Sequence, residues 1–325
     1  MRKGLRDTST TAIVETLQEI HDASARFTGR VLTLIIDASA ETQVDMLTDV
    51  VSEASREHPS RVLMLLGGDG ADAESRVDAD IRVGGEAGAS EIVLMRLSGA
   101  VANHPAAVVT PLLLPDTPIV TWWPNAAPAS PAHHPLGRIA QRRITDSYTD
   151  PSPDALARRA NNYRPGDSDM AWSRITQWRG QVASAVEVRP RAPIESVVIE
   201  GRADNPSIDL AAGWLAARLG VPVTRAGIAE DSIEEQGLDP HDTCRLTLRR
   251  PDGAIVLANR PGSTVSIEGP GRPDSTVALY HRTAAERLTE ELRHLDPDLA
   301  YAAAVGAIGS LSYPDFPSPV PDGEA

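Results

Sequence analysis

The chain has 325 residues, of which 41% are apolar and only 4% aromatic. Its length suggests about two domains and allows a sizeable core, which must be built mainly from Val, Leu, Ile and Ala. The 31 basic and 45 acidic residues give a net charge of −14, which argues against a general nucleic-acid binder and against binding to anionic membranes.

The cysteine count and the hydropathy pattern indicate the cellular compartment of the protein. Cys244 is the only cysteine, so an intrachain disulfide and a cysteine-cluster metal site are excluded. The first residues lack the apolar stretch of a secretory signal. The longest run of small apolar residues, 300–311, is too short to span a bilayer. We therefore expect a cytoplasmic protein.

Residues 1–150 predict an N-terminal α/β domain with a mostly parallel sheet flanked by helices. The runs at 31–37 and 61–67 are apolar without polar alternation, which is typical of strands buried on both faces. A helix at 40–57 between them supplies the right-handed crossover of a parallel sheet. Further strands are expected at 81–85, 91–97 and 119–123, and further helices at 11–25 and 101–114.

Residues 151–190 predict a helical connector. One helix is expected at 154–162 and a second at 171–186. The second helix has an apolar stripe made of Trp172, Ile175, Trp178 and Val182. Such a stripe is more typical of a core or a domain seam than of a functional face.

Residues 191–312 predict a C-terminal α+β domain with an antiparallel sheet, followed by a disordered Pro-rich tail at 313–325. The helix at 205–219 is expected to be capped by Ser207 and ended by Gly220. The Pro-Asp-Gly sequence at 251–253 predicts a hairpin turn. Strands are expected at 196–200, 221–224, 244–250, 254–259, 264–268 and 276–281, and closing helices, paired as a hairpin, at 284–294 and 297–307.

Residues 111–147 depart from this regular pattern. They contain a Trp-Trp pair at the end of an expected strand, which Pro124 ends. A proline-rich loop follows, and then a charged run. Because neighbouring strand residues point to opposite faces, Trp123 faces outward if Trp122 is core, and an outward Trp beside arginines is typical of an interface hot spot. The alternative is that Trp123 lies under the loop and the arginines pair with local carboxylates.

A glycine-rich turn follows the second buried strand. The backbone N–H groups of Gly67, Gly68 and Gly70 suit a phosphate, and the string Gly-Gly-Asp-Gly resembles the nucleotide loop of NAD kinases and lipid kinases. It lacks the GxGxxG spacing and has no lysine nearby. The alternative is that a turn leaving a strand needs glycine and aspartate for backbone reasons alone.

The remaining candidate residues form no catalytic or metal-binding set. His133 and His134 are adjacent in a loop, without the spacing of a zinc motif. Cys244 lies in an expected strand, where a small buried hydrophobe is the ordinary interpretation. Asp37 ends the first buried strand, a place where α/β proteins often bind ligands. We therefore predict no catalytic residues and no metal.

Three stretches resemble the OpcA family, the glucose-6-phosphate dehydrogenase assembly proteins of actinobacteria and cyanobacteria. LLLPDTPIVTWWP at 112–124 and PLGRIAQRRITDS at 135–147 resemble the family signature. IEGRADNPSIDLAAGWLAARLGVPV at 199–223 resembles the start of the family's C-terminal domain, with Ile199-Glu200 in place of the usual Val-Glu.

The resemblance implies a non-catalytic assembly factor and allosteric activator of the oxidative pentose phosphate pathway. Such a protein binds glucose-6-phosphate dehydrogenase, promotes its active oligomer and has no cofactor of its own, because NADP belongs to the partner. Cyanobacterial members are linked to thioredoxin control through cysteines, so the single cysteine here indicates an actinobacterial type. The alternative is a nucleotide- or sugar-phosphate-binding sensor or enzyme that uses the Gly67–Gly70 turn. The residues expected to contact the partner are Trp122, Trp123, Pro124, Arg138, Arg142, Arg143, Asp146 and Ser147.

Overall fold

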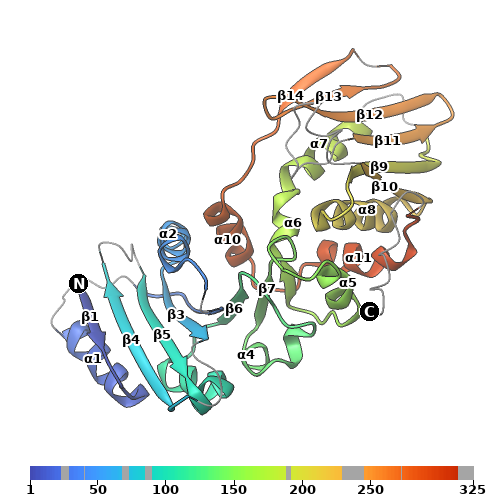
Figure 1. The fold of residues 1–325 in the computed structure, drawn as a ribbon. Coiled ribbons are helices and arrows are strands. Elements are labelled where there is room, and N and C mark those ends of the chain that lie inside the picture. Colours follow the sequence, from blue (N-terminus) through green and yellow to red (C-terminus); the bar gives the residue numbers. More distant parts are fainter. Residues whose placement is uncertain are drawn as a thin grey trace, which may run out of the picture. The chain divides into compact units, whose positions relative to one another are not determined.

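The computed structural model describes residues 1–22, 29–39, 41–67, 73–84, 90–187, 192–228, 245–271 and 273–313. The chain divides into two compact units (Figure 1). The first contains residues 1–173 and 282–298, and the second contains residues 174–281 and 299–325. The first unit is thus completed by a segment that follows the whole sheet of the second unit in sequence.

An eight-stranded sheet forms the centre of the first unit, in the order β1-β4-β5-β3-β2-β6-β7-β8. The six strands from β5 to β8 in this order run parallel, while β4 is antiparallel to β5 and β1 to β4. This confirms the predicted mostly parallel sheet. The strands are β1 (Arg2–Leu5), β2 (Leu32–Ala38), β3 (Ser60–Gly67), β4 (Arg76–Val83), β5 (Glu91–Ser98), β6 (Ile119–Trp123), β7 (Arg142–Thr145) and β8 (Asp167–Asp169).

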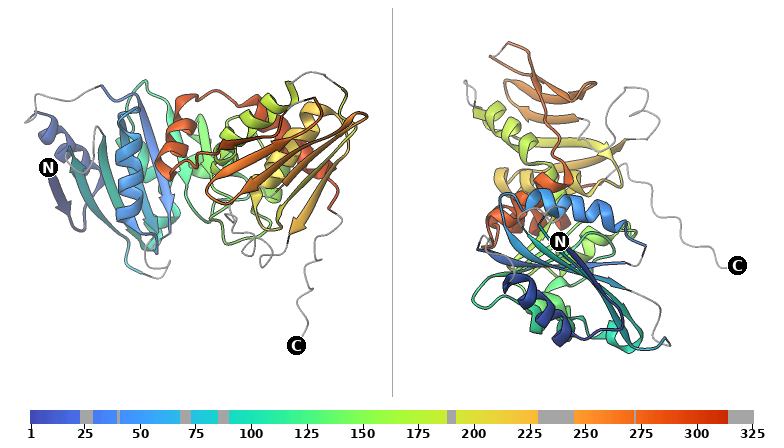
Figure 2. Two further views of the ribbon diagram at one scale, coloured as in Figure 1. Left: turned by 90° about the horizontal axis from the view of Figure 1, so that it is seen from above. Right: turned by 90° about the vertical axis from the view of Figure 1, so that its left-hand side faces the viewer.

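Helices cover both faces of this sheet, and α1 and α2 lie on opposite sides of it (Figure 2). On one face, residues of α1, α3 and α4 pack against the strands. On the other face, residues of α2 and α10 do so. Strands buried on both sides explain why β2 and β3 are apolar without alternation. The helices of this unit are α1 (Thr10–Asp22), α2 (Val44–Ala54), α3 (Pro105–Val109), α4 (Pro135–Arg138), α5 (Ala155–Asn161), α6 (Met170–Arg174) and α10 (Ala284–Arg293).

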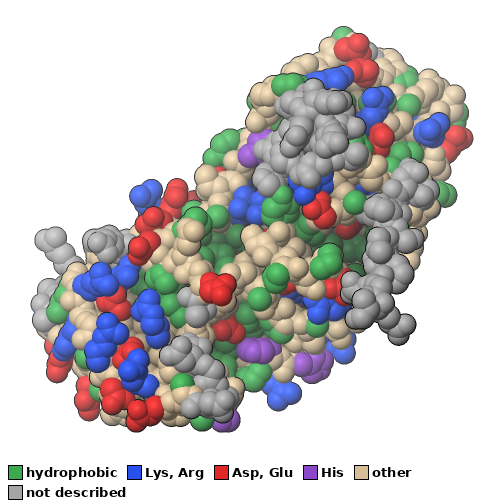
Figure 3. Space-filling view, viewed as in Figure 1, with side chains coloured by type: hydrophobic (Ala, Val, Ile, Leu, Met, Phe, Trp, Pro, Cys, Tyr) green, Lys and Arg blue, Asp and Glu red, His purple; other side chains and the backbone are tan. Residues whose placement is uncertain are grey.

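The outer strands β1 and β4 carry a charged network. In β4, Val77, Ala79 and Ile81 belong to the core, so the alternate side chains point to the opposite face. There Asp80 pairs with Arg2 at 2.6 Å, and Asp78 pairs with Arg76 at 3.1 Å and with Arg6, which follows β1, at 3.6 Å. Figure 3 shows basic and acidic side chains interspersed over this part of the first unit. Charges of this kind protect a sheet edge from pairing with another chain.

A six-stranded sheet forms the second unit, in the order β10-β9-β11-β12-β13-β14. Only β10 and β9 are parallel, and the other pairs are antiparallel, as predicted for this half. Helix α8 packs on β9 and β10, and α11 packs on α8. The elements are α7 (Thr176–Glu187), β9 (Ser196–Arg202), α8 (Pro206–Leu219), β10 (Val223–Ile228), β11 (Arg245–Arg250), β12 (Gly253–Arg260), β13 (Thr264–Glu268), β14 (Ser275–Ala278) and α11 (Leu299–Ala307).

Prolines and caps account for several differences from the predicted elements. The helix expected at 101–114 is broken into 3-10 turns at Gly99–Asn103 and Thr110–Leu112 around the short helix α3, because Pro105 and Pro111 start new turns instead of continuing one helix. The predicted cap of α8 is wrong by two residues: the Asn205 side chain accepts a hydrogen bond from the Ser207 N–H at 3.0 Å. Gly220 ends α8 in the left-handed conformation, with φ of 65°, as predicted.

The two closing helices, predicted at 284–294 and 297–307, pack in different units. Helix α10 packs on α2 of the first unit, whereas α11 packs on α8 of the second. The predicted hairpin of these two helices is therefore wrong.

The single helix expected at 171–186 is divided into α6 and α7. Trp172 donates to Asp298 at 2.8 Å in the first unit, and Trp178 lies edge-on to Trp214 at 6.4 Å in the second.

Two helical glycines offer a matched test of the α8–α11 contact. A Cβ on Gly213 would lie 2.2 Å from the backbone oxygen of Ala304 in α11, whereas a Cβ on Gly180 in α7 meets no described atom within 4 Å. We expect Gly213→Ala to lower the free energy of unfolding by about 1–3 kcal/mol because it forces the two helices apart. Gly180→Ala should raise it by about 0.5–1 kcal/mol, because alanine is the better helix former. Urea denaturation of both variants measures this, and equal effects would contradict the close packing.

Candidate functional site

The two tryptophans of β6 are both buried, on opposite faces of the sheet. Trp122 is 3% exposed and packs with Leu34 and Ile36, while Trp123 is 2% exposed and packs with Ile35 and Leu136. The expectation that Trp123 faces outward is wrong. Its premise, that the second face of the strand is free, fails because helices cover both faces of a parallel sheet.

The indole of Trp123 is held by a carboxylate and an imidazole. Its Nε1 donates a hydrogen bond to Asp37 Oδ2 at 2.9 Å. The ring of His134 stands edge-on to it, with the centroids 5.4 Å apart and the planes at 87°. Asp37 is the penultimate residue of β2, and Trp123 is the last residue of β6. Since Ile36 pairs with Trp122, the next residues of these parallel strands are neighbours on the other face.

Burial shifts the protonation of both polar groups. It raises the pKa of Asp37, against the effect of the Trp123 hydrogen bond and of nearby His134. It lowers the pKa of His134, against the opposing charge of Asp37. The His134 Nδ1 accepts a hydrogen bond from the Leu136 N–H at 3.4 Å. An accepting Nδ1 belongs to the neutral tautomer with its proton on Nε2.

These three residues lie where the strand order of the sheet reverses. From β2 the chain continues to β3 on one side and later returns to β6 on the other. Ligands of open α/β sheets bind at the carboxyl ends of such strands. A cavity of about 280 Å³ is present there. Its lining consists of Asp37, Leu65, Gly67, Leu97, Ala102, Asn103, Pro105, His134 and Pro135.

The loop between β6 and β7 is tied to the rest of the first unit at several points. The Ala127 N–H donates to Asp150 at 3.2 Å, and the Ala127 carbonyl accepts from Arg159 at 3.0 Å. Asn125 donates to Thr42 at 3.3 Å. A Cβ on Gly137 would lie 1.8 Å from the Pro131 carbonyl oxygen, so only glycine fits this turn. We call residues 124–138 the β6–β7 loop.

Arg142 connects β7 to two distant segments. It donates to Glu291 of α10 at 2.6 Å, to the Ser168 hydroxyl of β8 at 3.2 Å and to the Asp296 carbonyl at 3.1 Å. Both members of the Arg142–Glu291 pair are buried. Burial raises the pKa of Glu291, and the Arg142 charge opposes this shift. The pair therefore joins the sheet to a helix residue that lies 149 positions later in the sequence.

Arg143, Thr145 and Ser147 also have partners within the first unit. Arg143 pairs with Asp167 and donates to the Ala140 carbonyl at 3.0 Å. Asp169 accepts from the hydroxyls of Thr145 and Ser147, each at 2.6 Å. Sequence reasoning missed these partners because β8, Asp-Ser-Asp, has no apolar pattern. The partners it missed are Asp150, Arg159, Asp167, Ser168, Asp169 and Glu291.

The remaining predicted residues differ in exposure. Arg138 and His133 are exposed, Pro124 and His134 are half-buried, and Asp146 and Ser147 are buried. Gly67 ends β3 and lines the cavity. Gly68, Gly70 and Cys244 lie outside the described residues.

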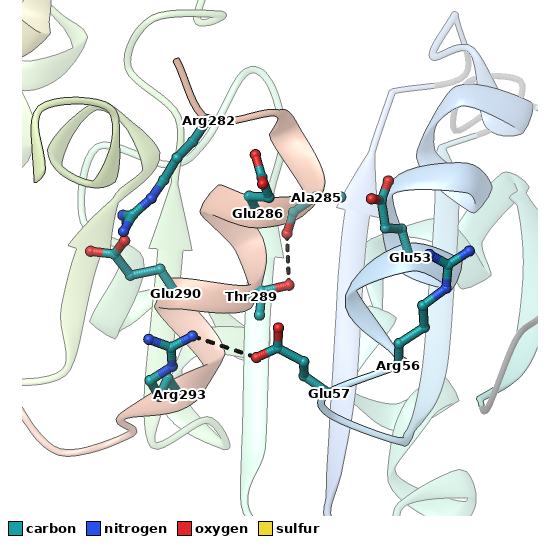
Figure 4. A pocket seen from close by; sticks show the side chains of 9 residues that line it. All are labelled: Glu53, Arg56, Glu57, Arg282, Ala285, Glu286, Thr289, Glu290 and Arg293. Atoms are coloured by element: carbon teal, nitrogen blue, oxygen red, sulfur yellow. Dashed lines mark hydrogen bonds and ion pairs between the residues drawn. The ribbon is translucent and has the colours of Figure 1, made fainter. Parts of the chain in front are cut away.

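A second hollow, of about 330 Å³, lies between α2 and α10 (Figure 4). In this hollow Arg293 of α10 forms a salt bridge with Glu57, which follows α2, at 3.5 Å. Helix α10 begins with a capping box in which Thr283 and Glu286 bond to each other's backbone N–H. The lining residues are Glu53, Arg56, Glu57, Arg282, Ala285, Glu286, Thr289, Glu290 and Arg293.

The described ranges contain neither a cluster of side chains suited to a metal ion nor a helix suited to crossing a membrane. No group of three or more His, Cys, Asp or Glu side chains there is arranged to hold a metal ion. Among the helices of that same part of the chain, none is long and apolar enough to cross a membrane.

Two family models match the chain. Residues 51–161 match the N-terminal domain, and residues 165–305 the C-terminal domain, of the family described as the glucose-6-phosphate dehydrogenase subunit. No curated protein sequence matches the chain.

Solved structures show only distant likenesses. One is GenD2 from gentamicin A biosynthesis in complex with NAD, with 10% identity, a TM-score of 0.35, and 89% of this chain and 95% of that one covered. Another is an oxidoreductase from Sinorhizobium meliloti, with 10% identity, a TM-score of 0.37 and 87% of each chain covered. Likenesses at this level say nothing of function.

The burial of Trp123 predicts its effect on stability. Trp123→Ala should lower the free energy of unfolding by about 3–5 kcal/mol because it opens a cavity in the core. Trp123→Phe keeps most of the volume but removes the hydrogen bond to Asp37, at a cost of about 1–3 kcal/mol. Met46→Ala, at a residue of α2 that is 60% exposed, is the control and should change stability by less than about 0.5 kcal/mol. If Trp123→Ala denatures like Met46→Ala, the tryptophan is not a core residue.

The pKa of His134 gives a second test. An NMR titration should place this pKa below its ordinary value of 6.5, and Asp37→Asn should lower it further by removing the charge that favours the protonated ring. Because folded His134 binds its proton less readily than the unfolded chain does, its stabilising contribution is complete above pH 6.5 and is lost as the pH falls below it. A pKa at or above 6.5, or a rise in Asp37→Asn, would contradict the burial of this ring.

Proposed function

The chain belongs to the OpcA family of glucose-6-phosphate dehydrogenase assembly proteins, and we propose that it is a non-catalytic factor that binds this dehydrogenase and promotes its active oligomer. The observation that carries the proposal is the match of both family domains, which together extend from residue 51 to residue 305. In this proposal NADP and glucose 6-phosphate are bound by the dehydrogenase, and the complex forms in the cytoplasm.

The β6–β7 loop is the contact surface that we propose for the dehydrogenase. It lies within the family signature, and it presents Arg138 and His133 to solvent. The hydrogen bonds of Asn125 and Ala127 hold its backbone before any partner binds. A surface that is already ordered loses less conformational entropy on binding, which favours affinity.

The buried members of the signature support this surface in our proposal. Trp123 packs on His134 at the start of α4, and Arg159 bridges Asp150, Ala127 and Ser147. Arg142 and Arg143 hold β7, the strand to which the loop returns. We therefore assign direct contact to half-buried Pro124 and exposed Arg138, and positioning to Trp122, Trp123, Arg142, Arg143, Asp146 and Ser147.

Activation follows from linkage. A protein that binds the active oligomer more tightly than the inactive form shifts the population by the ratio of the two affinities. Exposed Arg138 suits this role because a guanidinium makes charge-assisted, often paired, hydrogen bonds to carboxylates. The proposal thus needs a carboxylate-bearing surface on the dehydrogenase.

Mixing with the dehydrogenase of the same organism tests the function. We expect a larger complex by light scattering and a higher rate of NADP reduction in the presence of this chain. Unchanged size together with unchanged activity would refute the proposal.

The contact surface is tested separately by charge reversal. Arg138→Glu should weaken the complex about tenfold, mainly through slower association, with an altered salt dependence. Arg218→Glu, at an exposed position of α8 in the second unit, is the matched control and should bind like the parent. Equal affinity of both variants would remove Arg138 from the interface and leave the assembly function itself standing.

A further inference from the structure

The cavity at the carboxyl ends of β2, β3 and β6 contains a free acceptor beside a free donor. Asp37 uses Oδ2 for the Trp123 indole, and within the described residues its Oδ1 has no partner. His134 uses Nδ1 to accept from Leu136, which leaves its Nε2 proton without a partner among the residues that the structure describes. Both residues line the cavity. A hydroxyl group matches this arrangement because it donates to a carboxylate and accepts from an N–H at once.

The rest of the lining adds one more polar side chain and carbon surface. Asn103 supplies an amide, which both donates and accepts. Leu65, Leu97 and Pro135 supply carbon surface. The lining thus combines polar groups with carbon surface, as small-molecule sites do. A sugar or polyol likewise combines polar and apolar surface, because it has hydroxyls at its edge and C–H groups on its faces.

Size and charge narrow the ligand class. A cavity of about 280 Å³ lies just below the range of about 300–1,000 Å³ for ligand sites, so it suits one small molecule rather than a dinucleotide. Its described lining contains the Asp37 carboxylate and neither Arg nor Lys. A phosphate bound in so small a cavity would be repelled by the Asp37 carboxylate. The described lining holds no Arg or Lys that would offset this repulsion.

We propose that this cavity is a binding site for a neutral, hydroxyl-rich small molecule of monosaccharide size, held by Asp37 and His134. The site goes beyond the proposed assembly function and requires no dehydrogenase. It also differs from a phosphate site at the Gly67–Gly70 turn, because the ligand is recognised through hydroxyl groups. Both polar residues contact Trp123, so occupancy changes the surroundings of an indole in the core.

The test is titration of the isolated full-length chain by calorimetry and by tryptophan fluorescence. The probes are glucose, ribose and sorbitol, with inorganic phosphate as the anionic comparison. We expect saturable binding of at least one neutral probe in the micromolar to low-millimolar range, with a fluorescence change that Trp123→Phe abolishes. Phosphate should bind at least tenfold more weakly. Absence of saturable binding by all three neutral probes, or tighter binding of phosphate, overturns the proposal.

Two matched glycine variants separate a loss of binding from a loss of folding. Gly67 lines the cavity two positions after Leu65 in β3, so a side chain there would point to the same face as Leu65. Gly29 is not part of the lining, and a Cβ on either glycine meets no described atom within 4 Å. Gly67→Leu should abolish binding, and Gly29→Leu should retain it, with both variants denaturing like the parent. Binding that survives Gly67→Leu overturns the assignment to this cavity.

Substitution of the polar pair tests the recognition chemistry. Asp37→Asn keeps the shape but replaces a charged acceptor, and should weaken binding about tenfold or more. His134→Phe keeps a ring against Trp123 and removes the donor, and should weaken binding to a similar degree. Unchanged affinity in both variants overturns the role of these residues. Because no dehydrogenase is present, failure here leaves the assembly function untouched, and failure of the mixing experiment leaves this site untouched.

Discussion

The first unit depends on one constraint, which is that its parallel sheet is covered by helices on both faces. The central strands are accordingly apolar over most of their length, as residues 34–36 of β2 and 62–66 of β3 are. The same constraint buries Trp122 on one face and Trp123 on the other. A buried polar group in such a sheet needs a hydrogen-bond partner, and Asp37, near the end of β2, accepts a hydrogen bond from the Trp123 indole. The candidate cavity exists because the sheet reverses its strand order at this point.

Buried charge is the second determinant of the fold. Arg142, Arg143 and Arg159 lose their hydration and are each matched by carboxylates and carbonyls. Such a pair adds little net stability compared with apolar residues of the same shape, but removing one partner leaves an uncompensated charge, at a cost of about 3–5 kcal/mol. The network therefore selects one arrangement of β7, β8 and α10, since other registers would separate the charges. It also explains how two short polar strands, Arg-Arg-Ile-Thr and Asp-Ser-Asp, lie inside a protein.

The β6–β7 loop and the cavity share residues, which relates the two proposals physically. His134 lines the cavity, starts α4 and packs on Trp123. Arg138, the exposed residue assigned to the dehydrogenase contact, ends the same short helix. The most distinctive residues of the family signature thus lie beneath the surface that they shape. In our proposal these buried residues position the loop, and the exposed ones contact the partner.

The sequence by itself determined the fold class, most of the long helices and strands, and the family, because these depend on local periodicity and on specific short stretches. It indicated the Trp-Trp segment and Asp37 as unusual, and these do meet in space. It did not reveal strands β7 and β8 or the partners of their arginines, because buried polar strands lack an apolar period. It left open whether Trp123 faces outward or lies under the loop, and it did not reveal that α10 completes the first unit. These features depend on which faces are covered and on pairs such as Arg142–Glu291, contacts between distant positions that only the tertiary structure decided.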